Sequence, residues 1–153
     1  QLAQNYRSEF RASALRTPGG EASELFDGAL DLLRTLAAEN ATFLGVASGK
    51  SRRGFDRMVT ALGLENVFQT QQLADGHPSK PHPSMLLTAM AEMGVEPEQT
   101  VMIGDTSYDM LMAKASNVRG IGVNWGYHEP EVLRAAGAAS IASDFAHLHE
   151  LLN

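Results

Sequence analysis

Two carboxylates, Asp105 and Asp109, stand one helical turn apart directly after the apolar residues 100–103. A carboxylate at the end of a buried strand is well placed to hold a hard divalent cation, because Mg²⁺ prefers oxygen ligands. Asp109 is four residues further on, so on a helix it faces the same point. Asp105 has an alternative role as the cap of that helix, a frequent use of aspartate. The segment therefore predicts a metal site or a helix cap.

A hydroxyl and a glycine, Ser48 and Gly49, follow a second apolar run at residues 42–47. A serine hydroxyl and free backbone N–H groups at a strand-to-helix turn suit a phosphate oxygen, helped by the positive end of the helix that follows. Serine and glycine are also common at the start of any helix. The turn is thus a candidate phosphate site with an ordinary capping alternative.

Lys80 lies in a loop, residues 75–83, that contains three prolines. Prolines on both sides restrict the backbone and would hold the ammonium in a defined place. The alternative is a solvated lysine in a proline-rich turn. Together the three segments supply a hydroxyl, an ammonium and a carboxylate pair, the combination that phosphoryl transfer requires.

The rest of the chain alternates between helical and strand patterns. Apolar residues recur at i, i+3, i+4 and i+7 along residues 29–37, as on a buried helix face, whereas short apolar runs predict buried strands. We expect strands at residues 42–47, 67–71, 100–103, 120–123 and 140–142, and helices at 1–16, after 27, around 55–62, at 84–93 and 108–115, from 130 and after 143.

This alternation predicts an α/β fold with a Rossmann-like, doubly wound parallel sheet. In such sheets the functional groups gather at the carboxyl ends of the strands. All three polar segments fall at such ends or in the loop between them. We therefore expect one composite site.

Length and composition narrow the function classes. The 153 residues suit one domain, and the net charge of −6 shows no basic character for binding nucleic acid or an anionic membrane. The absence of cysteine excludes disulfides, thiolate zinc sites and a cysteine nucleophile. No apolar run is long enough to span a bilayer, and no secretory signal is visible. We expect a cytoplasmic protein.

In their order along the chain, the three segments resemble motifs of the haloacid dehalogenase (HAD) superfamily, specifically its phosphoglycolate-phosphatase-like hydrolases. Residues 43–48 match the second motif, an apolar strand that ends in serine or threonine. Lys80, in Ser-Lys-Pro-His-Pro, matches the third, and residues 104–109 match the acidic fourth motif, Gly-Asp-x-x-x-Asp. Residues 122–127 look like the segment after the next strand. The resemblance covers roughly residue 26 to the C-terminus and implies a HAD-like core at residues 21–153.

One family motif is missing. The first motif is an apolar strand followed by Asp-x-Asp-Gly, and the 153 residues contain no such segment. In the family its first Asp is the nucleophile, its second is the general acid and base, and its strand is central in the sheet. We therefore expect a gap between the strands before Ser48 and Asp105, although exposed strand edges are a liability. We interpret the chain as the C-terminal portion of a phosphatase, inactive alone, with residues 1–20 as the tail of a helical cap domain.

The resemblance implies a Mg²⁺-dependent phosphomonoester hydrolase that acts on a small phosphorylated metabolite through an aspartyl-phosphate. Ser48 and the N–H of Gly49 would bind the phosphoryl oxygens. Lys80 would be both catalytic and phosphate-binding, because it neutralises the nucleophile and the phosphate. Asp105 would be catalytic as a Mg²⁺ ligand together with the missing Asp. Asp109 would support the metal, directly or through another group.

Two other functions stay open. One is a phosphate-binding or regulatory domain without turnover, in keeping with the missing nucleophile. The other is a P-loop nucleotide-binding enzyme, since residues 45–51 nearly match that motif, but three residues rather than four separate the glycines, which removes an N–H from the phosphate cradle.

The substrate and several nearby residues are also left open. Phosphoglycolate, sugar phosphates, nucleotides and pyrophosphate all remain candidate substrates, and the oligomeric state is undetermined. Lys50, His77, His82 and His128 are either surface residues or substrate contacts.

Overall fold

The computed structural model describes residues 9–10 and 28–153. In these residues strands and helices alternate along the chain, as the sequence predicts. The strands are β1 (Glu9–Phe10), β2 (Gly45–Ala47), β3 (Thr70–Gln72), β4 (Val101–Gly104), β5 (Arg119–Val123) and β6 (Ser140–Ala142). The helices are α2 (Ala29–Ala37), α3 (Arg52–Leu62), α4 (Ser84–Met93), α5 (Ser107–Ala115), α6 (Pro130–Ala135) and α7 (Phe145–Leu152), with short 3₁₀ turns at Ala74–Gly76 and Pro97–Gln99. None of these helices is long and apolar enough to cross a membrane.

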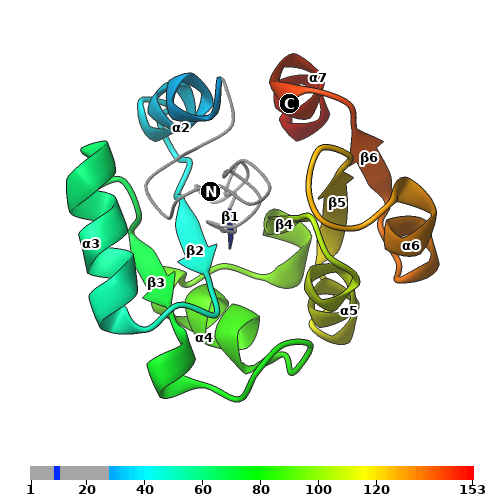
Figure 1. Cartoon of the computed structure of the whole chain (residues 1–153), viewed down its shortest axis with the longest axis horizontal. Helices are drawn as coiled ribbons and strands as arrows, with labels where there is room; N and C mark the ends of the chain where they lie inside the picture. The colour runs from blue at the N-terminus through cyan, green and yellow to red at the C-terminus, as the bar shows by residue number, and fades with distance from the viewer. Residues whose placement is uncertain (1–8, 11–27) are drawn as a thin grey trace.

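The strands form a six-stranded parallel sheet in the order β3-β2-β1-β4-β5-β6. Helices cover both of its faces, with α2 and α7 on one side and α4 and α5 on the other (Figure 1). From β1 the chain adds β2 and β3 on one side of the sheet and then β4, β5 and β6 on the other. The sheet therefore changes its direction of growth next to β1, and α/β proteins bind ligands at such a switch point. The prediction of a Rossmann-like, doubly wound α/β fold is confirmed.

The expected gap in the centre of the sheet is filled. Between β2 and β4, where the sequence predicted an opening, the two-residue strand β1 pairs with both neighbours, Phe10 opposite Val46 and Glu9 opposite Met102. The two flanking strands present rows of N–H and C=O groups that need partners, and a short extended segment satisfies part of them. The helix predicted over residues 1–16 is therefore wrong at residues 9 and 10. The rest of the expected cap remnant, residues 1–20, lies outside the described residues.

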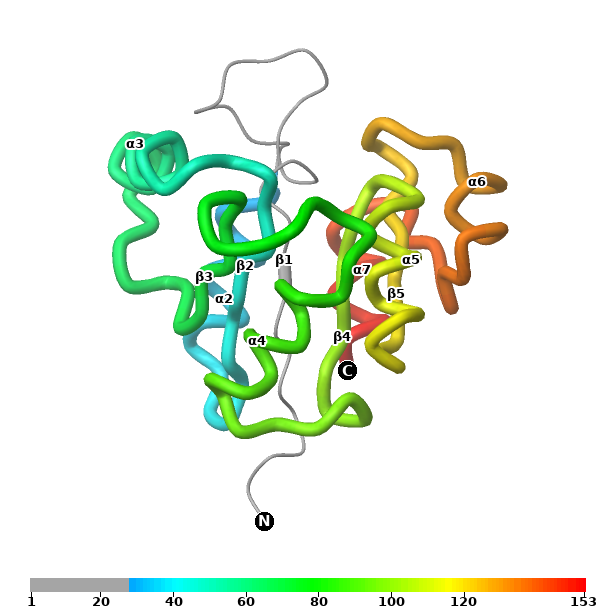
Figure 2. Tube along the Cα trace, turned by 90° about the horizontal axis from the view of Figure 1, so that it is seen from below, coloured from blue at the N-terminus to red at the C-terminus, as the bar shows by residue number. Residues whose placement is uncertain are grey.

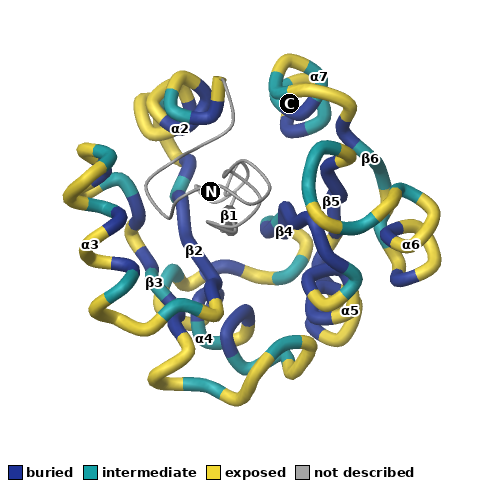
Figure 3. The backbone as a smooth tube through the Cα atoms, viewed as in Figure 1, coloured by how far each residue is buried: buried dark blue, intermediate teal, exposed yellow. Residues whose placement is uncertain are grey.

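Two hydrophobic cores hold the sheet between its helices. Successive strand residues point to opposite faces, so Val46 and Ile103 enter one core while Ala47 and Met102 enter the other. Most residues of β2, β4 and β5 are buried, and the helices expose their outer sides (Figure 3). Each fully buried side chain of this kind contributes about 1.5–3 kcal/mol. Both cores therefore hold the strand ends that carry the polar segments.

Glycines end two of the helices. Gly63 after α3 and Gly94 after α4 have φ of 68° and 66°, a left-handed conformation that glycine adopts without a Cβ penalty. The start of α3 is capped by Ser51, whose side chain accepts a hydrogen bond from the N–H of Gly54. These caps set where each helix meets the loop before it.

Candidate active site

The loop between β3 and α4 brings Lys80 across the carboxyl end of the central strand. The Lys80 Nζ donates to the carbonyl oxygen of Ala47 at 2.7 Å and to Asp109 Oδ1 at 2.9 Å. Ala47 ends β2 and Asp109 lies on α5 just after β4, and these two strands flank β1. In Figure 2 the loop runs from β3 toward α5. The structure thus brings two of the predicted segments into direct contact.

Lys80 and Asp109 form a buried ion pair, with side chains 6% and 0% exposed. The second carboxylate oxygen, Asp109 Oδ2, accepts from the Thr106 backbone N–H at 3.2 Å and from the Thr106 hydroxyl at 2.9 Å. Thr106 is in turn the N-cap of α5 and accepts from the Asp109 N–H. A buried charge is tolerated when it is paired and hydrogen-bonded in this way. Asp109 therefore fixes the position of the Lys80 ammonium.

Asp105 is completely buried, and one of its oxygens lacks a partner. Asp105 Oδ2 accepts from the Tyr127 N–H at 3.2 Å, whereas Oδ1 has no hydrogen-bond partner among the described residues. An isolated buried carboxylate oxygen costs several kcal/mol, a cost that a cation with vacant coordination positions removes. Asp105 therefore fits a Mg²⁺ ligand. Its alternative role as the cap of α5 is wrong, because Thr106 is that cap.

Two glycines make room for these carboxylates. A Cβ on Gly104 would overlap the Asp109 side chain, and a Cβ on Gly126 would overlap the Cβ of Asp105. Gly104 is thus required in the Gly-Asp-x-x-x-Asp motif because a side chain there would collide with Asp109, and not because its φ is positive. Gly126 comes from the loop after β5, so that loop closes over Asp105.

Asp105 and Asp109 do not by themselves form a multidentate metal cluster. In the described ranges, no group of three or more His, Asp and Glu side chains is arranged to hold a metal ion. Both Asp109 oxygens are engaged by Lys80 and Thr106. Of the two predicted metal residues, Asp105 therefore has a carboxylate oxygen without a hydrogen-bond partner in the described part of the chain, whereas Asp109 is engaged by Lys80 and Thr106.

The turn after β2 is more open. Ser48 is 2% exposed, its N–H donates to the Gln72 carbonyl at 2.9 Å, and its Oγ accepts from the Lys50 N–H at 3.1 Å. Ser51 caps α3, so capping does not account for Ser48. Apart from its two neighbours in the chain, no described residue has an atom within 4 Å of the position that a Cβ on Gly49 would take. The turn thus has space for a ligand beside its backbone.

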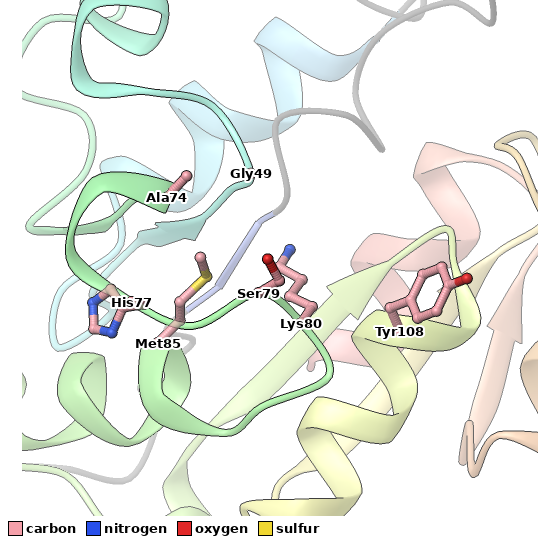
Figure 4. Close-up of a pocket in the computed structure, with 7 residues that line it drawn as sticks. All are labelled: Gly49, Ala74, His77, Ser79, Lys80, Met85 and Tyr108. Carbon is pink, nitrogen blue, oxygen red and sulfur yellow. The ribbon is translucent and has the colours of Figure 1, made fainter.

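A pocket of about 200 Å³ joins this turn to Lys80. It is lined by Gly49, Ala74, His77, Ser79, Lys80, Met85 and Tyr108. Figure 4 shows Lys80 between Gly49 and Tyr108. Of the predicted phosphate-binding residues, Gly49 and Lys80 line this cavity, whereas the buried Ser48 is not among its lining residues. Tyr108, which is 52% exposed, was not singled out from the sequence, because a tyrosine inside an acidic motif has no spacing signal of its own.

The loop histidines are held by hydrogen bonds within the chain. His128 Nδ1 accepts from the Ser107 N–H at 2.8 Å, and His82 Nδ1 accepts from the Ser84 N–H at 3.1 Å. Of the three histidines, His77 alone lines the pocket. Its ring nitrogens contact Ser84 and Gln72.

The P-loop alternative does not fit the structure. Residues 45–47, which include the first glycine of that near-match, form the buried strand β2 and are not part of a loop. A phosphate cradle needs those backbone N–H groups to be turned toward the ligand. The nucleotide-binding interpretation is therefore wrong.

Comparison with known proteins identifies the family. Residues 2–123 match the model of the haloacid dehalogenase-like hydrolases. This chain belongs to that family. The resemblance seen in the ordered motifs is confirmed.

Several relatives carry phosphatase names. The chain is 37% identical over 144 residues to the probable phosphatase IndB of Dickeya dadantii, an alignment that covers 92% of this chain and 60% of the relative. It is 35% identical over 119 residues to a phosphoglycolate phosphatase of Colwellia psychrerythraea, which covers 75% and 51%. A solved structure of a predicted phosphatase from Clostridium acetobutylicum matches with a TM-score of 0.77 at 26% identity and covers 88% and 63%. The chain thus spans between 51% and 63% of the length of these relatives.

Proposed function

We propose that this chain forms the phosphate- and Mg²⁺-binding part of a phosphomonoester hydrolase whose reaction passes through an aspartyl-phosphate. The observation that carries the proposal is the Oδ1 of buried Asp105, which has no hydrogen-bond partner among residues 9–10 and 28–153 and lies one helical turn from Asp109 of the Lys80–Asp109 pair. Membership of the HAD-like hydrolases and the phosphatase names of the relatives support the same class.

Each residue has a defined task in this proposal. The Gly49 N–H binds a phosphoryl oxygen in the pocket that Gly49 and Lys80 line, and the Ser48 hydroxyl beside it binds a second one. Lys80 places its positive charge where negative charge accumulates during transfer, and Asp109 holds the ammonium there. Asp105 holds Mg²⁺ through its open oxygen. When bound, the cation offsets charge on the phosphoryl oxygens.

The nucleophile is assigned to a segment that these 153 residues do not supply, because they contain no Asp-x-Asp. An oxygen of the first carboxylate of such a segment attacks phosphorus, and the ester P–O bond breaks. The leaving oxygen takes a proton from the second carboxyl group. Water then attacks the acyl phosphate, which releases inorganic phosphate and restores the carboxylate. The chain alone is accordingly inactive in this proposal.

The substrate class is a small phosphorylated metabolite. Phosphoglycolate is the first candidate, from the name of the Colwellia relative, and pyrophosphate is a second, from relatives named pyrophosphatase PpaX. The acidic composition argues against nucleic acid or an anionic membrane as a partner. The cytoplasmic location stays a prediction.

The test compares the 153-residue chain with a protein that joins it to an Asp-x-Asp segment. Mg²⁺-dependent phosphate release is measured with para-nitrophenyl phosphate, phosphoglycolate, a sugar phosphate and pyrophosphate. The joined protein should release phosphate, and the chain alone should not. Lys80→Ala and Asp105→Ala should each lower kcat by about 10³-fold. Asp31→Ala and Lys114→Ala, at exposed positions on α2 and α5, are the matched controls.

Two outcomes would contradict the proposal. Near-normal rates in both the Lys80 and Asp105 variants would remove the site assignment. Mg²⁺-dependent turnover by the 153 residues alone would remove the assignment of the nucleophile to a further segment.

A phosphate-binding domain without turnover is the second candidate, and the absence of Asp-x-Asp favours it. In that case the joined protein would bind inorganic phosphate and hydrolyse none of the four compounds. Phosphate binding that is lost in Lys80→Ala, without hydrolysis in any variant, would establish this function in place of the enzyme.

A further inference from the structure

The His77 ring is held at both of its nitrogens beside the pocket. Nδ1 lies 2.6 Å from Ser84 Oγ, and Nε2 lies 2.8 Å from Gln72 Oε1. Figure 4 shows this ring on the same pocket as Lys80 and Gly49. Neither the metal nor the phosphate role proposed above uses His77, so its two side-chain contacts call for another explanation.

A series of hydrogen bonds favours one tautomer of this ring. The Thr70 hydroxyl donates to Glu92 Oε1 at 2.7 Å, and Gln72 Nε2 donates to Thr70 Oγ1 at 2.8 Å. The amide oxygen of Gln72 therefore faces His77, and because a carbonyl oxygen only accepts, His77 Nε2 must carry the proton. Nδ1 is then the acceptor for the Ser84 hydroxyl. These contacts fit one tautomer of the neutral imidazole and one ring position.

The His77–Ser84 hydrogen bond closes the base of the loop that carries Lys80. The two residues are seven positions apart, with Lys80 between them. A further hydrogen bond inside the loop runs from the His82 N–H to the Ser79 carbonyl at 3.1 Å. Ser84 is also the first residue of α4, so the closed loop is anchored on a helix. The bond therefore limits the movement of the lysine backbone.

Gln72 connects this loop to the phosphate-binding turn. Its side chain holds His77, and its backbone carbonyl accepts the Ser48 N–H at 2.9 Å. The Lys80 ammonium itself contacts the carbonyl of Ala47, the residue before Ser48. Gln72 is 4% exposed in β3, so this link is part of the packed sheet.

We propose that Gln72, His77 and Ser84 act as a clamp that positions Lys80 relative to Ser48 and Gly49. The inference rests on the proposed function, because its effect is exerted on phosphoryl transfer through Lys80. His77 is a positioning residue here and does not touch the reacting atoms. Since a displacement of about 1 Å in a reacting group costs about 100-fold in rate, a loosened clamp lowers kcat while the fold persists.

The experiment uses the protein that joins this chain to an Asp-x-Asp segment, with para-nitrophenyl phosphate and Mg²⁺. His77→Phe keeps a ring but removes both hydrogen bonds, and it should lower kcat about 10-fold to 100-fold. Ser84→Ala is the milder variant and should show the same direction of change. His149→Phe on α7 is the matched control and should keep the unmodified kcat. Thermal unfolding of each variant verifies that it is folded.

A double-variant series separates positioning from general destabilisation. In a Lys80→Ala background, His77→Phe should cause no further loss of kcat, because the clamp acts through Lys80. His77→Phe combined with Ser84→Ala should be no worse than His77→Phe alone. Additive losses in the Lys80→Ala background would overturn the clamp.

The remaining outcomes are equally decisive. Full kcat in folded His77→Phe would overturn the clamp and leave the proposed function intact. Absence of turnover in the unmodified joined protein would overturn the proposed function and the clamp with it. As a readout independent of activity, the ¹⁵N shifts of the His77 imidazole should report protonation at Nε2, and protonation at Nδ1 of the neutral ring would contradict the proposed network.

Discussion

The turns after β2 and β4 flank the same central strand, yet they are built in opposite ways. After β4, Asp105 and Asp109 are both 0% exposed, and Gly104 has no space for a Cβ. After β2, a Cβ placed on Gly49 would meet no described residue other than its neighbours in the chain within 4 Å, and that glycine lines a pocket. One turn is packed around charge, and the other leaves space beside the Gly49 backbone.

The difference follows from what each turn has to hold. A buried carboxylate is stable only when fixed partners compensate its charge, so its surroundings must be tightly packed. Phosphate oxygens are bound by N–H groups that must remain accessible. Lys80 links the two turns, because its ammonium contacts Ala47 on one side and Asp109 on the other. The packed turn after β4 thus holds charged groups in fixed positions, and the open turn after β2 leaves space for a ligand.

The largest expected effect on stability comes from removing the charge that links the turns. Lys80→Met leaves the buried Asp109 carboxylate without its ammonium, and we expect the free energy of unfolding to fall by about 3–5 kcal/mol. Urea unfolding of the 153-residue chain measures this loss. Adding Asp109→Asn to Lys80→Met should restore part of it, since the uncompensated charge is then gone. A loss below 1 kcal/mol in the single variant would show that the pair behaves as an exposed one.

A matched pair of glycine substitutions tests the packing difference directly. Gly104→Ala forces a Cβ into the Asp109 side chain and should cost at least about 2 kcal/mol of unfolding free energy. Gly49→Ala meets no atom and should change that free energy by less than about 0.5 kcal/mol. Urea unfolding of both variants gives the comparison. Equal losses would mean that the two turns are packed alike.

The smallest effect concerns the partnerless oxygen of Asp105. Asp105→Asn replaces a buried negative charge by a neutral amide, so without Mg²⁺ the variant should be about 1–2 kcal/mol more stable than the unmodified chain. Thermal unfolding in EDTA is the measurement. Asp31→Asn, at an exposed position on α2, is the control and should show no gain. A clear loss of stability in Asp105→Asn would mean that the carboxylate has a stabilising role in the fold itself.

The regular pattern of the chain made most of the strands predictable. The strand at residues 140–142 was placed at its observed bounds, and the run at 100–103 was displaced by one residue from β4 (Val101–Gly104). β3 was expected at residues 67–71 and lies at Thr70–Gln72. Its residues are polar but buried, since Thr70 and Gln72 are satisfied by hydrogen bonds to Glu92 and His77. An apolar pattern does not locate a strand of this kind.

The central strand was the largest discrepancy. Residues 9 and 10 lie in a stretch with a helical pattern, but they pair with β2 and β4. Their conformation follows from the hydrogen-bonding groups on both neighbouring strands and not from their own propensities. Local patterns contain no information on such a vacancy, because it is created by chain segments far away in the sequence.

By itself the sequence determined the α/β class, the order of the three polar motifs and, through that order, the family. These features depend on periodicity and spacing, which are local properties of the chain. The tertiary structure decided which groups meet: Lys80 pairs with Asp109 across 29 residues, and the loop after β5 closes over Asp105 to leave one oxygen open. Hydrogen-bond partners of this kind are set by strand order and loop closure. The contrast between the packed turn after β4 and the open turn after β2 is therefore a property of the folded sheet.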